Sequence, residues 1–431
     1  MRNDHTMRQD RYGYELTTDS AAAADAYIEG VDRLLSAEPE VDLPLLKALE
    51  ADDGFALAHL ALARAMQMHG RGSEVKAPLG RALALAPMTT EREQSQIRIF
   101  EKILTGQGLA AIPMIEAHVK TWPRDAMVVA PATGVFGLIG FSGQAGREER
   151  QLAFLEPLAT HYGDDWWFLT VLAFAEVELQ HHESALRNIG TALAIRPRNA
   201  HAAHIRAHLF YEMGEREEGL PFLTDWYRDY PRSGQLHCHI SWHLAIWSME
   251  SGQRDEAWRI FEDAVFPGGS WGPAINTLTD GASFMLRAEL AGEARRPEMW
   301  RKMADFAAEW FPATGVTFAD VHSALAYAMA GDAAALKALT TAPKGPAADL
   351  LAPIADGFDA FAQGDWQRAA ARIETVLESH ERIGGSRAQR DLLEYTVAYA
   401  LARSGEREKA RRQIVARRPQ DAREGLPLAG L

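Results

Sequence analysis

The sequence has almost no cysteine and no long apolar run, and each absence excludes a class of protein. Cys238 is the only cysteine among 431 residues, so no disulfide can form within the chain and a reducing compartment is expected. Met1–Ser20 lacks the apolar stretch of a signal peptide. The longest uncharged stretch, Ala126–Gly146, is interrupted by glycines and a proline and favours a buried helix and a turn over a membrane span. We therefore predict a cytoplasmic protein without membrane contact.

Positive charge is outnumbered by negative charge, with 45 Lys and Arg against 59 Asp and Glu. The formal net charge is -14, which argues against a surface that binds nucleic acid. The sequence contains no nucleotide-binding glycine loop, nucleophile elbow or zinc-finger spacing. The chain is longer than a single hydrophobic core usually supports, so several domains or one repeat array are expected.

Internal repetition is what the sequence does have, with a period of about 34 residues. Trp166–Asn199 fits one unit of two antiparallel helices, and the next unit begins at Ala200. Small residues recur where paired helices would touch, glycine recurs at the turn, and proline recurs near the unit end. The same signals recur at Ala56, at Gly252 with Ala257, at Gly364 with Ala369, and at Gly405 with Ala410.

These repeats predict an all-α fold, namely an α-solenoid of antiparallel helix pairs with a tetratricopeptide-like right-handed superhelix. We expect one continuous solenoid over residues 1–431, without strands. Its expected parts are N-terminal capping helices (1–50), N-terminal repeats (51–165), central repeats with a polar site (166–330) and C-terminal repeats (331–431). The first helices of the pairs should line a concave groove.

Seven short strings, in this order and spacing, resemble the tetratricopeptide repeat protein 38-like family over nearly the whole chain. They begin at Asp10, Phe55, Asn199, His239, Asp280, Asp320 and Gly384. The chain departs from that family at Arg387, where histidine is usual, and at Ile240, where asparagine is usual. The resemblance implies the fold and the position of a site, and it implies no particular reaction.

The central repeats carry a group of histidines at helical spacing. His204, His208 and Glu212 are four residues apart, so they share one helical stripe. His239 and His243 follow 35 residues after the first pair, so the two pairs should lie side by side on neighbouring helices. Four such histidines, with a carboxylate nearby, could hold zinc, manganese or iron. Without a metal, the same groups suit general acid–base catalysis.

Further polar residues complete the predicted site. Asp320 and His322 are assigned to catalysis with the histidine group, whereas Asp320 as a helix N-cap is the structural alternative. We expect four residues to bind substrate: Asp280, Arg287, Trp242 and Arg390.

Structural alternatives accompany several of these residues. An ordinary Asp280–Arg287 ion pair is one. Ser386 is expected to cap a helix, with Asp391 paired to Arg390 or Arg387, and the functional alternative is a Gly-Gly-Ser turn that offers backbone N–H groups to an anion. Cys238 is expected to be inert packing.

The functional prediction is a small-molecule-binding protein, and an enzyme of hydrolase or lyase type acting on an amide or ester or by elimination. The cofactor would be a divalent metal or none. A peptide- or protein-binding scaffold without catalysis is the alternative, and a purely structural histidine network is a third. Partners are expected to be a small molecule in the groove or a peptide, with a homo-oligomer left open.

Overall fold

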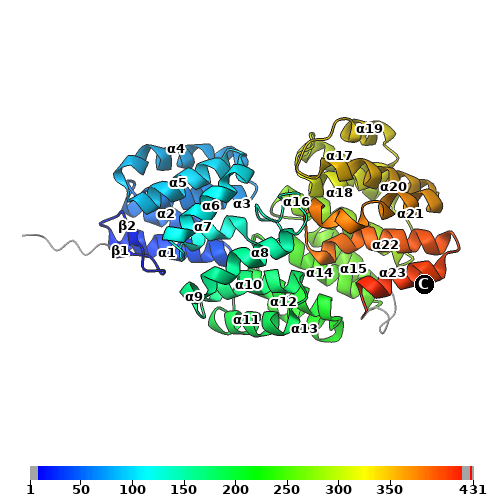
Figure 1. The fold of residues 1–431 in the computed structure, drawn as a ribbon, viewed down its shortest axis with the longest axis horizontal. Coiled ribbons are helices and arrows are strands. Elements are labelled where there is room, and N and C mark those ends of the chain that lie inside the picture. Colours follow the sequence, from blue (N-terminus) through cyan, green and yellow to red (C-terminus); the bar gives the residue numbers. More distant parts are fainter. Residues whose placement is uncertain (1–7, 420–427, 430–431) are drawn as a thin grey trace, which may run out of the picture.

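The computed structural model describes residues 8–419 and 428–429 and is built from successive helix pairs (Figure 1). The predicted segments 1–50 and 331–431 therefore include residues 1–7, 420–427 and 430–431, which lie outside the described residues. The all-α solenoid class is confirmed, because consecutive helices pack on one another along the chain. None of the helices in the described residues is long and apolar enough to cross a membrane.

The N-terminal part begins with a small antiparallel ladder of β1 (Arg8–Gln9) and β2 (Glu15–Leu16). The helices that follow are α1 (Ala21–Ser36), α2 (Asp42–Ala51), α3 (Ala56–Met68), α4 (Lys76–Leu85), α5 (Glu91–Leu104), α6 (Gly108–Thr121), α7 (Ala126–Val129), α8 (Arg147–Leu155) and α9 (Ala159–Tyr162). The expectation that the chain has no strand missed this ladder. Its two strands have two residues each, and the Asp10 carboxylate holds the turn between them by accepting hydrogen bonds from the backbone N–H groups of Tyr12 and Tyr14.

The central part consists of α10 (Trp166–Glu178), α11 (His182–Ile195), α12 (Ala200–Met213), α13 (Arg216–Tyr227), α14 (His237–Glu250), α15 (Arg254–Ala264) and α16 (Ala274–Leu290). The C-terminal part consists of α17 (Pro297–Trp310), α18 (Thr317–Ala330), α19 (Ala333–Thr340), α20 (Leu351–Gln363), α21 (Trp366–Glu374), α22 (Arg387–Arg403) and α23 (Arg407–Arg417). Short 3₁₀ turns lie at Gly72–Glu74, Ala86–Met88, Ala130–Ala132, Glu156–Leu158, Ala348–Leu350 and Leu377–Ile383.

Local signals set the helix bounds. The helices predicted to begin at Ala56, Trp166 and Ala200 do begin there. The Asn199 side chain caps α12 by accepting a hydrogen bond from a backbone N–H of the first turn, and Gly214 ends the helix in the left-handed conformation at a φ of 74°. Such caps satisfy backbone groups that a helix cannot pair internally.

The superhelix closes on itself, so the groove predicted along the first helices is covered near its centre. Helix α22 packs against α16 and α12, although more than 95 residues separate α22 from the nearer of them in sequence. Arg147 at the start of α8 donates a hydrogen bond to the backbone oxygen of Gly385 just before α22. The inner faces of α12 and α16 are therefore buried instead of lining an open concave surface.

Candidate functional site

Four histidines from α12 and α14 meet in the interior of the central repeats. His204 and His208 lie one turn apart on α12, and His239 and His243 lie one turn apart on α14. One ligand nitrogen from each of the four lies within 4.8 Å of the others. The structure thus brings the two predicted pairs together. Helix α14 begins at His237, so its pair stands nearer the helix start than the pair on α12.

The four rings are closely packed and buried. The Nε2 atoms of His208 and His204 are 2.8 Å apart and share a hydrogen bond. Ring centroids lie 4.6 Å apart for His208 and His243, and 4.7 Å apart for His204 and His239. None of the four residues exposes more than 6% of its surface. An ion at the centre would therefore be surrounded by imidazole nitrogens.

Burial keeps the imidazoles neutral. It holds the pKa of His204, His208 and His243 well below the ordinary value, and the neighbouring histidines lower the pKa of each further. A neutral imidazole offers a lone pair, which is the form that binds a metal ion. Three of the four side chains are thus in the ligating form at neutral pH.

Asp280 on α16 fixes the orientation of one ligand. The Nδ1–H of His239 donates to the Asp280 carboxylate at 2.7 Å, which leaves the Nε2 lone pair of His239 free. The other Asp280 oxygen accepts a hydrogen bond from the Gln389 side chain on α22, at 3.4 Å. A carboxylate behind a histidine is the usual outer support of a metal-binding imidazole.

His322 on α18 adds a free lone pair beside this carboxylate. Its Nδ1–H donates to the Phe318 backbone oxygen at 2.7 Å, so Nε2 is the unprotonated nitrogen. Burial lowers the pKa of His322 to about 4, and the negative charge of Asp280 works in the opposite direction. This nitrogen has no hydrogen-bond partner in the part of the chain that the structure describes.

Other buried polar atoms on the same three helices also lack partners among the described residues. On helices α14, α16 and α18 they include Trp242 Nε1, His237 Nδ1 and His243 Nε2, Thr279 Oγ1 and Ser283 Oγ, and Ser323 Oγ. Trp242 itself stacks on His239, with ring planes 10° apart. Since buried polar groups normally have partners, each of these atoms is a candidate contact for water, a metal ion or a polar ligand.

Glu212 lies on the α12 stripe but belongs to a different cluster. Its carboxylate accepts hydrogen bonds from Arg418 and, at 3.1 Å, from Arg387. Asp391 on α22 pairs with the same Arg418, at 2.6 Å, and accepts from the Tyr211 hydroxyl. The predicted pairing of Asp391 with Arg390 or Arg387 is therefore wrong, because the C-terminal Arg418 occupies that place.

Arg287 and Arg390 are held by carboxylates other than those expected. Arg287 pairs with Glu250 at 3.0 Å, so the alternative of an Asp280–Arg287 ion pair is wrong. Arg390 pairs with Glu148 on α8. The charges of these carboxylates favour the guanidinium form, and they raise the pKa of both arginines although burial opposes it. Both side chains form ion pairs that connect different helices.

Asp320 does not cap a helix. Helix α18 begins at Thr317, and the Asp320 carboxylate instead accepts a hydrogen bond from the Gly315 backbone N–H at 3.1 Å. Burial raises the pKa of Asp320 to about 7. Residues two apart on a helix point about 200° apart, so Asp320 and His322 face different sides of α18.

Two structural alternatives are confirmed. Ser386 caps α22 in a capping box with Gln389. Cys238 is buried, and burial raises the pKa of its thiol well above the ordinary value, so it stays protonated and inert.

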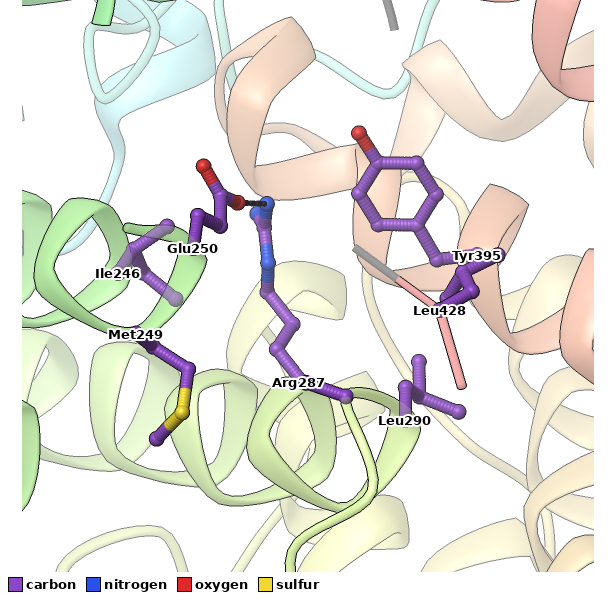
Figure 2. Close-up of a pocket in the computed structure, with 8 residues that line it drawn as sticks. Ile246, Met249, Glu250, Arg287, Leu290, Tyr395 and Leu428 are labelled. Atoms are coloured by element: carbon purple, nitrogen blue, oxygen red, sulfur yellow. Dashed lines mark hydrogen bonds and ion pairs between the residues drawn. The ribbon is translucent and has the colours of Figure 1, made fainter. Parts of the chain in front are cut away.

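A small pocket lies beside Arg287, as Figure 2 shows. The Arg287–Glu250 ion pair forms one wall, and Tyr395 and Leu428 form the opposite side. The pocket has room for about one water molecule, so it can hold no substrate in this conformation.

Sequence reasoning missed several contributors to this interior. Arg418 and Glu250 were not selected, although each pairs with a residue that was. Thr279 and Ser283 were also missed, and the available signal was their four-residue spacing around Asp280 on one helix.

Comparisons with known proteins find weak similarity to solved structures. No protein-family model matches the chain. A structure of the human IFIT1 dimer with PPP-AAAA is similar at 13% identity, covering 96% of this chain and 98% of that chain, with a TM-score of 0.44. A structure of Naa15/Naa10 bound to HypK-THB is similar at 14% identity, covering 91% of this chain and 62% of that chain, with a TM-score of 0.24. The fold assignment above rests on the helix pairs of this chain itself.

Proposed function

We propose that the protein is a metal-dependent enzyme of hydrolase or lyase type that acts on a small molecule. The observation that carries the proposal is the convergence of four buried histidine nitrogens within 4.8 Å. An all-imidazole site suits zinc, iron, copper or nickel better than manganese, which prefers oxygen ligands. When bound, the metal would supply Lewis-acid activation of a water or a carbonyl group.

The surrounding residues have distinct roles in this proposal. Asp280 orients His239 through the 2.7 Å hydrogen bond and so directs Nε2 towards the ion. His322 Nε2 accepts a proton from the reacting group, and Asp280 favours the imidazolium that forms. Trp242, Thr279 and Ser283 supply unpaired polar atoms that can orient the substrate.

A metal-free structural network is the competing account of the same residues. The hydrogen bond between His204 and His208 favours it, because these two rings already satisfy each other in part. It leaves His243 Nε2 and His322 Nε2 buried without partners, which a purely structural network should avoid. The peptide-binding scaffold stays a prediction, and the packing of α22 on α12 and α16 covers the inner surface that such a peptide would use.

The proposal also includes the family of the protein and its location in the cell. The seven ordered strings support a divergent member of the tetratricopeptide repeat protein 38-like family, and the single cysteine supports a reducing, cytoplasmic location.

The experiment is a hydrolase and lyase screen of the purified protein after removal of metal and reloading with zinc, iron or copper. We expect activity only in a loaded form, with loss in His243→Ala and a large fall in kcat in His322→Gln. His181→Ala on an exposed turn is the matched control and should keep full activity. Equal activity in the metal-free protein or in folded His243→Ala would refute the proposal.

A further inference from the structure

A second histidine site lies in the N-terminal repeats, apart from the four-histidine cluster. Ser95 on α5 contacts His118 on α6, with 2.9 Å between Ser95 Oγ and His118 Nδ1. The other ring nitrogen, Nε2, lies 3.2 Å from the carboxylate of Asp125, the residue before α7. A hydroxyl, an imidazole and a carboxylate thus form a series of hydrogen bonds, as nucleophilic catalysis requires.

The Asp125 carboxylate selects the tautomer of His118. Burial opposes ionisation of Asp125, but the hydrogen bond with His118 and the charge of Arg92 outweigh burial and lower its pKa. Arg92 donates to the same carboxylate at 2.8 Å. An ionised Asp125 accepts the Nε2–H of His118, so Nδ1 carries the lone pair that accepts the Ser95 hydroxyl proton. The tautomer is the one in which His118 can act as a general base.

The surroundings hold the base and leave the nucleophile accessible. The His118 ring is buried and packs on Trp122 at a centroid distance of 4.8 Å. Ser95 is half-buried, so part of it reaches solvent. Arg98 is exposed three residues further along α5, on the same face of the helix. Its positive charge suits a substrate that carries negative charge.

We propose that Ser95 is an activated nucleophile that hydrolyses acyl esters carrying a negative charge, independently of the metal centre. Ser95 Oγ forms a bond to the ester carbonyl carbon as its proton passes to His118 Nδ1. The carbon–oxygen bond to the leaving alkoxide breaks, and the alkoxide takes that proton. Water then attacks the acyl-serine with His118 again as base, which releases the carboxylic acid and restores the serine.

The test is reaction of the full chain with a fluorophosphonate probe in the presence of chelator, followed by peptide mass spectrometry. We expect a single adduct on Ser95 in the wild type and none in Ser95→Ala. Ser184→Ala is the matched control, because Ser184 follows His181 by three residues and its hydroxyl donates to the backbone oxygen of that histidine. It should label like the wild type.

The base and its carboxylate are tested with shape-conserving variants. We expect His118→Gln and Asp125→Asn each to slow labelling by about 100-fold or more while the circular dichroism spectrum stays unchanged. Arg98→Ala should slow hydrolysis of a succinyl nitrophenyl ester more than hydrolysis of the acetyl ester.

Some outcomes would overturn the proposal. One is a folded wild type without an adduct on Ser95. Another is a His118→Gln variant that labels at the wild-type rate, which would mean that the three residues form only a structural hydrogen-bond chain. Because chelator is present throughout, neither outcome bears on the metal centre.

Discussion

At the residue scale, the molecule places neutral imidazoles where an ordinary interior would place apolar side chains. The His204, His208 and His243 rings share about the same burial as the alanines around them. Their burial costs free energy unless the lone pairs find partners. A shared metal ion would satisfy several of them at once, which is the physical reason to expect one there.

Asp280 gives the most specific prediction at this scale. Asp280→Asn keeps an oxygen that can accept the His239 Nδ1–H but removes the negative charge. We expect metal affinity to fall by about 10- to 100-fold, as is usual when an outer-shell partner of a metal ligand is changed. Isothermal titration of the metal-free variant with zinc measures it. An unchanged affinity would mean that Asp280 does not support the site.

Acid should destabilise the metal-free protein through His204, His208 and His243. Their pKa is lower in the folded chain than in the unfolded chain, so below pH about 6.5 the unfolded state binds more protons and the free energy of unfolding falls with falling pH. Each histidine contributes at most about 1.4 kcal/mol per pH unit in that window.

Urea unfolding at pH 7 and pH 5.5 measures this effect. His208→Gln should show a smaller loss between the two pH values than the wild type, because one proton-binding group is gone. Equal losses in both proteins would show that His208 is not neutral in the fold.

At the element scale, the contacts of α22 connect the site to the far end of the chain. Gln389 joins this helix to Asp280, and Asp391 joins it to Arg418 just after α23. Glu212 on α12 accepts from the same Arg418, so one guanidinium ties three elements together. All three charged groups expose 2% or less of their surface.

Removal of that guanidinium should be costly. Arg418→Ala leaves Glu212 and Asp391 buried without their main partner, and such a loss destabilises by about 3–5 kcal/mol. Arg407→Ala on the exposed face of α23 is the control, expected within about 0.5 kcal/mol of the wild type. Chemical denaturation compares the two. Equal stabilities would show that the ion-pair cluster contributes little.

At the scale of the whole molecule, repeat-level features could be predicted from the sequence and closure could not. Helix starts such as Ala200 follow from a cap residue before them and a glycine turn after them. The 35-residue step from His204 to His239 equals one repeat, so their contact follows from the period alone.

Contacts across the superhelix depend on the rotation between successive repeats. The Gln389–Asp280 bond spans 109 residues and the Arg418–Glu212 bonds span 206. They form only after the small rotation between successive repeats has accumulated over many repeats. No local sequence pattern encodes the accumulated rotation. The sequence therefore predicted neither the covering of the groove nor the role of Arg418.

The metal content of the intact protein tests the central claim most directly. Native mass spectrometry of freshly purified wild type, with and without chelator, should show one metal ion per chain that chelator removes. His204→Ala and His243→Ala should each lack that increment while keeping a folded charge-state distribution, and His181→Ala should retain it. A wild type that stays at the bare polypeptide mass even after incubation with zinc, iron or copper would contradict the account.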